Sequence, residues 1–303
     1  MLANLFSVEL WERFSFYGMQ GILLYYMYYS VADGGLGIDL AVATGLVGAY
    51  GGGVYLSTIL GAWVADRLLG SERVLFYAAA IVMLGHISLA VLPGMAGLAS
   101  GLILIALGSG GVKANATSLV GTLYDEKDER RDAGFSIFYM GINIGALVGP
   151  LLTGLAWTEY GFHYGFGLAA VGMAIGLVQY GMTRKYLPES AHEVSNPLPR
   201  AQFKKVILWT AAALVAVILA VVFGLLTAGN LAPVMATLAV LASIGYFVVI
   251  LTSKKVNQLE RRRVYSFMPL FVASAAFWAL FQQQFTVVAI YADTSLDRNV
   301  FGV

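Results

Sequence analysis

Residues 41–73 read AVATGLVGAYGGGVYLSTILGAWVADRLLGSER, and this stretch decides the fold class. From Ala41 to Ala65 it contains no charged residue, and a run of about 20 apolar residues is long enough to cross a bilayer as a helix. Charged residues follow at once, beginning with Asp66 and Arg67. The pattern predicts a membrane helix over 41–66 that ends in a basic loop at the membrane surface.

The composition of the whole chain is also that of a membrane protein. Hydrophobic residues make up 59% and charged residues 12% of the 303 positions, against about 45–50% and 25% in soluble domains. The chain has no cysteine, which excludes a disulfide framework and a cysteine metal site. A net charge of +1 without a basic stripe argues against a nucleic-acid partner. We expect no cofactor and no metal.

Eight further apolar stretches predict membrane helices, and turn-forming residues such as Pro93-Gly94 separate them. The N-terminus lacks the basic region of a signal peptide, so we expect the first span to stay in the protein. The nine predicted spans cover residues 5–30, 41–66, 74–92, 97–122, 135–156, 163–183, 204–226, 231–252 and 267–291.

Basic residues mark alternate loops. Lys and Arg follow the second, fourth, sixth and eighth spans, whereas loops 31–40, 93–96, 157–162 and 227–230 contain none. Basic loops stay on the cytoplasmic side, so the pattern predicts a multi-pass protein of the cell inner membrane with a cytoplasmic N-terminus. It also makes 204–252 a hairpin that leaves the cytoplasm and returns. The basic loop residues are Arg67, Arg73, Lys127, Arg130, Arg131, Arg184, Lys185, Arg200, Lys204, Lys205, Lys254, Lys255, Arg261, Arg262 and Arg263.

Three ionisable residues lie in the first predicted span. Each costs at least about 2.5–3.5 kcal/mol inside a membrane, which makes each a candidate functional residue. Helical spacing places Glu9, Arg13 and Tyr17 on one stripe, with Glu12 beside them. Two carboxylates held against one guanidinium form a site where one proton or one anionic ligand changes the pairing. The alternative is a structural ion pair of Glu9 with Arg13 near the membrane surface.

A fourth ionisable residue, Lys113, stands near the middle of the fourth span, in LGSGGVKAN (107–115), with no acidic residue near it in sequence. An ammonium at that depth needs a carboxylate, a water-filled cavity or a substrate carboxylate. The alternative is a lysine that reaches the membrane surface. Asn143 in the fifth span is a weaker candidate, because a buried Asn also serves to bridge helices.

Several motifs resemble those of the proton-dependent oligopeptide transporter family of the major facilitator superfamily. Residues 9–18, ELWERFSFYG, are similar to its ExxERFxYYG signature, with Phe16 in place of the first tyrosine. Residues 138–146, FYMGINIGA, are similar to its FYxxINxG signature. Residues 61–70, GAWVADRLLG, resemble the loop motif after the second helix of major facilitator proteins. Six spans, a linker and further spans also resemble the major facilitator layout.

The resemblance implies an all-α major facilitator fold in four parts. A six-helix bundle (1–183) and a cytoplasmic linker (184–203) come first. A transmembrane hairpin (204–252), of a kind inserted in bacterial members, separates them from the first span of a truncated C-terminal bundle (253–303). We expect the chain to be part of a longer transporter whose missing C-terminal helices complete the path and supply the partner of Lys113.

The implied activity is symport of protons with di- and tripeptides by alternating access. Arg13 would bind the peptide carboxylate and exchange partners with Glu9 and Glu12 as a proton arrives, because charge-assisted contacts suit a carboxylate. The residues that the resemblance places at the peptide are Arg13, Tyr17, Tyr55, Lys113, Asn143 and Gln282.

Two glutamines depart from the family pattern. Gln20 stands where many members carry an arginine, and Gln282 where many carry a glutamate. Those family positions can form a salt bridge on the extracellular side. Here we predict an amide pair, Gln20 with Gln282, at the outward gate; the alternative is that the two never touch.

Other functions stay open. A related carrier of nitrate or another small anion is disfavoured by the two glutamates beside Arg13. A non-transporting peptide-binding membrane protein is a second alternative. An enzyme is the weakest, because no nucleophile motif or metal-spaced histidine pair is present. We expect His86 to be a hydrogen-bonded structural residue and assign no role to His163 or His192.

Overall fold

A computed structural model describes residues 1–125 and 127–297. The described chain is helical and contains no strand. It forms two compact units, Met1–Leu231 and Ala232–Val303. The boundary falls inside the stretch predicted to form a hairpin, and the division into four parts stays a prediction.

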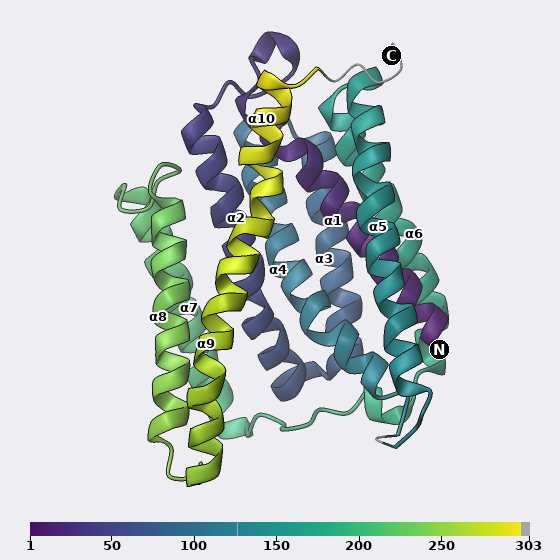
Figure 1. Cartoon of the computed structure of the whole chain (residues 1–303), viewed down its shortest axis with the longest axis vertical. Coiled ribbons are helices and arrows are strands. Elements are labelled where there is room, and N and C mark those ends of the chain that lie inside the picture. The colour runs from purple at the N-terminus through teal and green to yellow at the C-terminus, as the bar shows by residue number, and fades with distance from the viewer. Residues whose placement is uncertain (126, 298–303) are drawn as a thin grey trace. The chain divides into compact units, whose positions relative to one another are not determined.

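Six helices of the first unit form a bundle, coloured purple to teal in Figure 1. Helix α1 packs against α5 and α6, α4 packs against α2 and α3, and α3 also contacts α6. A helix lies at each of the six predicted spans, with ends that differ from the prediction by a few residues. The helices are α1 (Leu2–Tyr28), α2 (Leu40–Val64), α3 (Ser71–Val91), α4 (Gly94–Gly121), α5 (Arg131–Tyr160) and α6 (Phe162–Thr183), followed by α7 (Arg200–Val222).

Local chemistry explains where several helices begin and end. Asp39 precedes α2, and its carboxylate accepts hydrogen bonds from the backbone of Ala41 (3.0 Å) and Val42 (3.2 Å), as helix N-caps do. Gly161, with φ of 100°, makes the turn between α5 and α6 in a conformation that favours glycine. Helix α2 continues into a π-helical turn, Ala65–Leu69, which brings the basic loop back toward α3.

The bundle has an apolar interior and an apolar exterior. Eight helical segments of the described chain are long and apolar enough to cross a membrane. Helix α1, which carries three charged residues, is not one of them, and the bundle buries those charges. Outward-facing side chains are large and hydrophobic, as lipid contact requires. They include Leu147, Leu151, Leu155, Val171 and Val178, and the buried ones include Leu5, Val8, Leu75, Val82, Val112, Phe138 and Met173.

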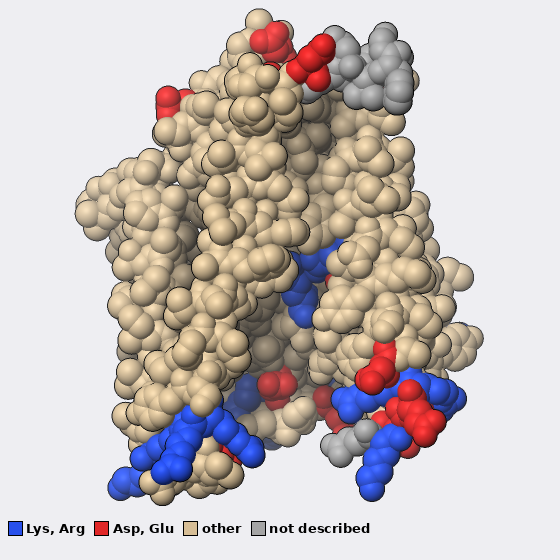
Figure 2. Space-filling view, in the orientation of Figure 1, with Lys and Arg blue, Asp and Glu red and all other residues tan. Residues whose placement is uncertain are grey.

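Charged side chains gather at the helix ends. Because consecutive helices run in opposite directions, the ends of α2, α4 and α6 and the starts of α3 and α5 lie at one end of the bundle (Figure 1). Figure 2 shows Lys and Arg side chains at that lower end and few along the flanks. The bundle residues involved are Arg67, Arg73, Lys127, Arg130, Arg131, Arg184 and Lys185.

The linker after α6 is packed, although its sequence reads as a solvated connection. It contains two short 3₁₀ turns, Arg184–Tyr186 and Glu189–Ala191. Its backbone amides at Asn196 and Leu198 donate to the carbonyls of Asp66 and Arg67, both at 2.9 Å. Leu187, Ala191 and Leu198 are buried. The linker is therefore attached to the loop between α2 and α3.

The second unit corrects one predicted helix. The span predicted at 267–291 lies within Gln258–Ser295, a helical segment long and apolar enough to cross a membrane. It is not one regular α-helix: α9 (Gln258–Phe281) tightens into a 3₁₀ turn at Gln282–Phe285, and α10 (Val287–Ser295) follows. The apolar pattern runs across this break, so hydropathy does not reveal it. Helix α9 also begins earlier than predicted, because Asn257 and Glu260 form a reciprocal capping box before the arginines. The remaining helix, α8, spans Leu231–Thr252 as predicted.

Candidate functional site

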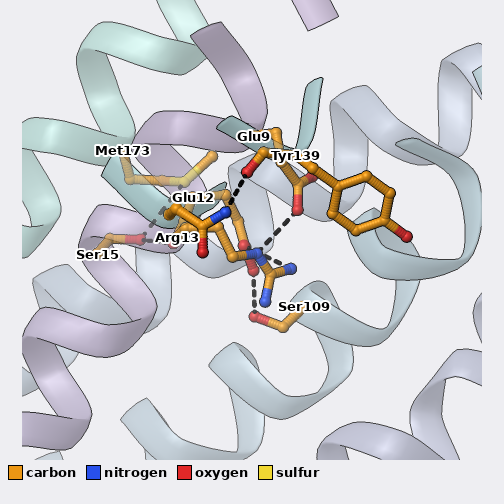
Figure 3. A network of polar contacts seen from close by, with 8 residues as sticks. Glu9, Glu12, Arg13, Ser15, Ser109, Tyr139 and Met173 are labelled. Carbon is orange, nitrogen blue, oxygen red and sulfur yellow. Dashed lines mark hydrogen bonds and ion pairs between the residues drawn. The ribbon is translucent and has the colours of Figure 1, made fainter. Parts of the chain in front are cut away.

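The charged residues of α1 form one buried cluster (Figure 3). The Nε atom of Arg13 lies 2.8 Å from Oε1 of Glu9, and its Nη2 atom lies 2.8 Å from Oε2 of Glu12. The side chains of Arg13, Glu9 and Glu12 are only 4%, 5% and 0% exposed. The i, i+4 spacing predicted the first pair, and both pairs form at once. Two carboxylates inside the bundle therefore share one guanidinium.

A hydroxyl from another helix completes this cluster. Ser109 of α4 donates a hydrogen bond to Oε1 of Glu12 at 2.9 Å, and both residues are fully buried. The sequence reading did not assign Ser109 a role. The feature of the sequence that points to Ser109 is its hydroxyl in a glycine-rich stretch, four residues before Lys113.

Lys113 lies between two aromatic rings. Its Nζ atom is 4.8 Å from the ring centre of Phe16 on α1 and 4.9 Å from that of Tyr55 on α2. Aromatic faces attract cations at this range. Among the described residues, no carboxylate oxygen lies within 4.0 Å of this ammonium. The structure thus brings the predicted Lys113 and Tyr55 together and adds Phe16, which the sequence showed only as a departure from a signature.

Tyr17 and Asn143 have contacts of different kinds. The ring of Tyr17 packs edge-on against that of Phe16, with centroids 5.3 Å apart. The exposed amide of Asn143 donates to the carbonyl of Tyr139 on its own helix at 3.0 Å. That bond stays within α5, so it does not bridge two helices.

The two glutamines of the predicted gate lie in different units. Gln20 on α1 is buried, and its Oε1 has no hydrogen-bond partner among the described residues. Gln282 lies half-buried in the 3₁₀ turn after α9. Their pairing stays a prediction.

The histidines have different environments. The prediction of a hydrogen-bonded His86 is wrong for the described chain: the ring is fully buried in α3, and neither nitrogen has a partner. Most buried polar groups are paired, so this ring is an exception that the sequence did not predict. His163 contacts the carbonyl of Leu89 at 2.9 Å through Nδ1. His192 joins a second charged cluster.

This second cluster surrounds Glu72 at the start of α3. Its fully buried carboxylate pairs with Arg184, at 2.6 Å from Nε and 2.8 Å from Nη2, and lies 3.2 Å from Nδ1 of His192. The Arg184 guanidinium also stacks 4.2 Å above the Phe76 ring. The sequence reading placed Glu72 outside the third span and missed it. The cluster ties the linker to the bundle.

Comparison with known proteins identifies the family of this chain. A model of the POT family matches residues 72–303, a stretch that begins after α1. A di-/tripeptide transporter of Lactococcus lactis subsp. lactis is 42% identical over 314 residues, which cover all of this chain and 63% of that protein. The chain therefore spans about three-fifths of the length of the curated relatives it matches.

Solved structures show the same fold. The crystal structure of a peptide transporter POT in complex with sulfate is 48% identical, with a TM-score of 0.93, and the match covers 100% of this chain and 62% of that one. A POT family transporter in complex with a thioalcohol-conjugated peptide is 40% identical, with a TM-score of 0.93 and coverage of 100% and 63%. The predicted all-α major facilitator fold is confirmed. The chain is a multi-pass membrane protein that belongs to the POT family.

Proposed function

We propose that this chain forms the N-terminal three-fifths of a proton-coupled symporter of di- and tripeptides that works by alternating access. The observation that carries the proposal is the buried Arg13 guanidinium shared by Glu9 and Glu12. Charged residues cost free energy inside a membrane protein, so a buried charge cluster there indicates a function. Relatives named di-/tripeptide transporters support the substrate class.

The cluster suggests how protons and peptide are coupled. A proton on either glutamate breaks one of the two ion pairs of Arg13 and frees that side of its guanidinium for another anion. A peptide carboxylate has the charge and the planar geometry to take that place. Proton binding and peptide binding thus favour one another, because the peptide carboxylate replaces the negative charge that the proton removes.

The remaining predicted residues surround this exchange. We assign Lys113 to the peptide carboxylate, because its ammonium is held by ring faces and has no carboxylate within 4.0 Å among the described residues. Tyr17, Tyr55 and Asn143 would hydrogen-bond the peptide. Gln282 would face the peptide from the second unit and form the outward gate with Gln20.

The orientation follows from the charges. We propose that the basic end of the bundle faces the cytoplasm, with the N-terminus on that side of the cell inner membrane. Further C-terminal helices would complete the translocation path. An enzymatic activity is not part of the proposal.

The test is gradient-driven uptake of a labelled dipeptide into liposomes. The protein would be a transporter of its relatives' length that contains these 303 residues. Uptake should require an inward proton gradient and fall at least about tenfold in Lys113→Ala and Glu12→Gln, the loss expected for a charged hydrogen bond. Glu189→Gln, the same chemical change at an exposed linker position, serves as the control.

The outcomes separate the alternatives. Uptake that does not depend on the proton gradient, or that persists in both variants, would contradict the proposed coupling of protons to peptide transport. Nitrate that competes with the dipeptide, or is itself taken up, would favour a small-anion carrier. Binding of peptide without any uptake would favour a non-transporting peptide-binding protein.

A further inference from the structure

Glu12 is held through its two oxygens by two different helices. Oε2 pairs with Arg13 of α1 at 2.8 Å, and Oε1 accepts the hydroxyl of Ser109 on α4 at 2.9 Å (Figure 3). The carboxylate is fully buried, so water does not compete for either oxygen. Each oxygen of the carboxylate therefore has a partner of its own.

Ser109 also joins the charge cluster to the helix that carries Lys113. The two residues lie four positions apart on α4, which places them on adjacent turns of one face. The glycines beside Ser109 let this part of α4 pack closely against two neighbouring helices. A Cβ at Gly110 would lie 2.5 Å from Ser57 of α2, and a Cβ at Gly111 would lie 2.7 Å from Ala78 of α3. The backbone that carries Ser109 is thus packed closely against α2 and α3.

We infer that Ser109 is a positioning residue for proton coupling: by occupying Oε1 of Glu12, it directs an arriving proton to Oε2, where the proton displaces Arg13. The inference rests on the proposed function and extends it. A proton on Oε2 breaks the ion pair of Glu12 with Arg13 and frees the Nη2 side of the guanidinium, whose Nε atom stays paired with Glu9. A proton on Oε1 would leave Oε2 beside Arg13 and release the guanidinium less completely.

Other ionisable groups also surround Glu12 and must be kept constant in a test. On α1 they are Glu9, Arg13 and Tyr17, and on α4 Lys113. Helix α6 presents the uncharged Met173, whose Sδ lies 3.8 Å from the hydroxyl of Ser15. Helix α2 presents Tyr50 and Tyr55, whereas the ring of Tyr139 on α5 points away from the cluster.

The chain offers a matched control. Ser15 is also buried beside Glu12, but its hydroxyl donates to the backbone carbonyl of Glu12 at 2.9 Å and does not touch the carboxylate. Ser109→Ala and Ser15→Ala therefore remove the same atom from the same region. Ser109→Thr keeps the hydroxyl and serves as the rescue variant.

The experiment measures gradient-driven dipeptide uptake against pH, and gradient-free peptide exchange, in a transporter of the relatives' length. Loss of a hydrogen bond to the charged form makes Glu12 easier to protonate. In Ser109→Ala the pH midpoint of uptake should therefore rise by about one to two units, the equivalent of one charged hydrogen bond. Gradient-driven accumulation should fall about tenfold while exchange persists, because protonation no longer displaces Arg13 efficiently. Ser109→Thr should restore both values, and Ser15→Ala should leave both unchanged.

Infrared titration of the purified protein supplies a readout that does not depend on transport. The carboxyl band that disappears in Glu12→Gln should titrate at higher pH in Ser109→Ala than in the parent. An unchanged band, an equal shift in Ser15→Ala, or a parallel loss of uptake and exchange would overturn the inference. Parent protein that takes up no peptide overturns the proposed function, whereas a band that still shifts would leave the Ser109–Glu12 assignment standing.

Discussion

The ammonium of Lys113 lies 4.8 Å from the ring centre of Phe16, at the position where this chain departs from its family's tyrosine signature. The phenyl ring presents a face to the cation and adds no hydroxyl. With Tyr55 on the other helix at 4.9 Å, the ammonium is held by attraction that leaves its donors available to a ligand. A departure in sequence thus becomes part of the candidate binding site.

Replacement of this ring should weaken peptide binding. Cation–π attraction is worth about 0.5–2 kcal/mol, so Phe16→Leu should weaken competition by unlabelled dipeptide about two- to thirtyfold. Phe16→Tyr keeps the ring face and should remain within about twofold of the parent. Equal affinity in the leucine variant would show that the ring does not hold Lys113 for a ligand.

Arg13 should not tolerate lysine. Its Nε and Nη2 atoms contact different glutamates, at 2.8 Å each, and one ammonium lacks the planar fork that reaches both. Loss of one charged contact of about 1.5–3 kcal/mol predicts that Arg13→Lys lowers uptake about ten- to a hundredfold. Arg130→Lys, at a side chain that is 82% exposed, is the control. Wild-type uptake by Arg13→Lys would show that a single contact is enough.

Gly145 should be required for packing at the site. A Cβ there would lie 2.8 Å from the backbone nitrogen of Phe14 and 2.9 Å from Cβ of Arg13, closer than real contacts. Overpacking of this kind costs about 1–3 kcal/mol, so Gly145→Ala should lower the melting temperature in detergent and reduce uptake. Gly154 on the same helix has open space around it, and Gly154→Ala should be neutral or stabilising by up to about 1 kcal/mol. Similar effects at both positions would contradict the close approach of α1 and α5.

The linker should detach when Glu72 loses its charge. Glu72→Gln leaves Arg184 without its buried counter-ion and weakens the contact with His192. We expect a stability loss of about 1–3 kcal/mol, seen as a lower melting temperature, and faster proteolysis within 184–200. Glu189→Gln, at an exposed position in the same linker, should change neither. A linker that stays resistant in Glu72→Gln would show that its apolar residues and backbone bonds suffice.

The loop between α4 and α5 should not contribute to the pH dependence of transport. Hydrogen bonds from the Arg130 side chain and backbone hold the pKa of Asp128 below its usual value. The stabilisation from a lowered carboxyl pKa is present above the unfolded value and is lost only as pH falls through the lower folded value. Between pH 5 and 8 Asp128 is therefore constantly charged, and Asp128→Asn should leave the pH profile of uptake unchanged. A shifted profile would place a second titrating site in this loop.

The local part of this structure was predictable from the sequence. Each of the nine apolar runs lies in a helical part of the described chain, although a 3₁₀ turn interrupts the last one. The reason is that the lack of water in a bilayer leaves the helix as the way to satisfy each backbone group. The neighbours Glu9 and Arg13 followed from i, i+4 geometry, which holds in any helix. The family followed from two signatures, residues 9–18 and 138–146, and the comparisons confirmed it.

Contacts between helices were decided by the tertiary structure. The meeting of Ser109 with Glu12, of Lys113 with Phe16, and of Glu72 with Arg184 depends on how each helix is rotated and shifted against its neighbour. The small residues at the helix contacts set that rotation through close approach, and apolar periodicity is weak evidence for it when lipid and interior are both hydrophobic. The sequence by itself therefore determined the helices, their charges and the family. Only the packed bundle decided which charges share a partner, since that depends on atoms far apart in the chain.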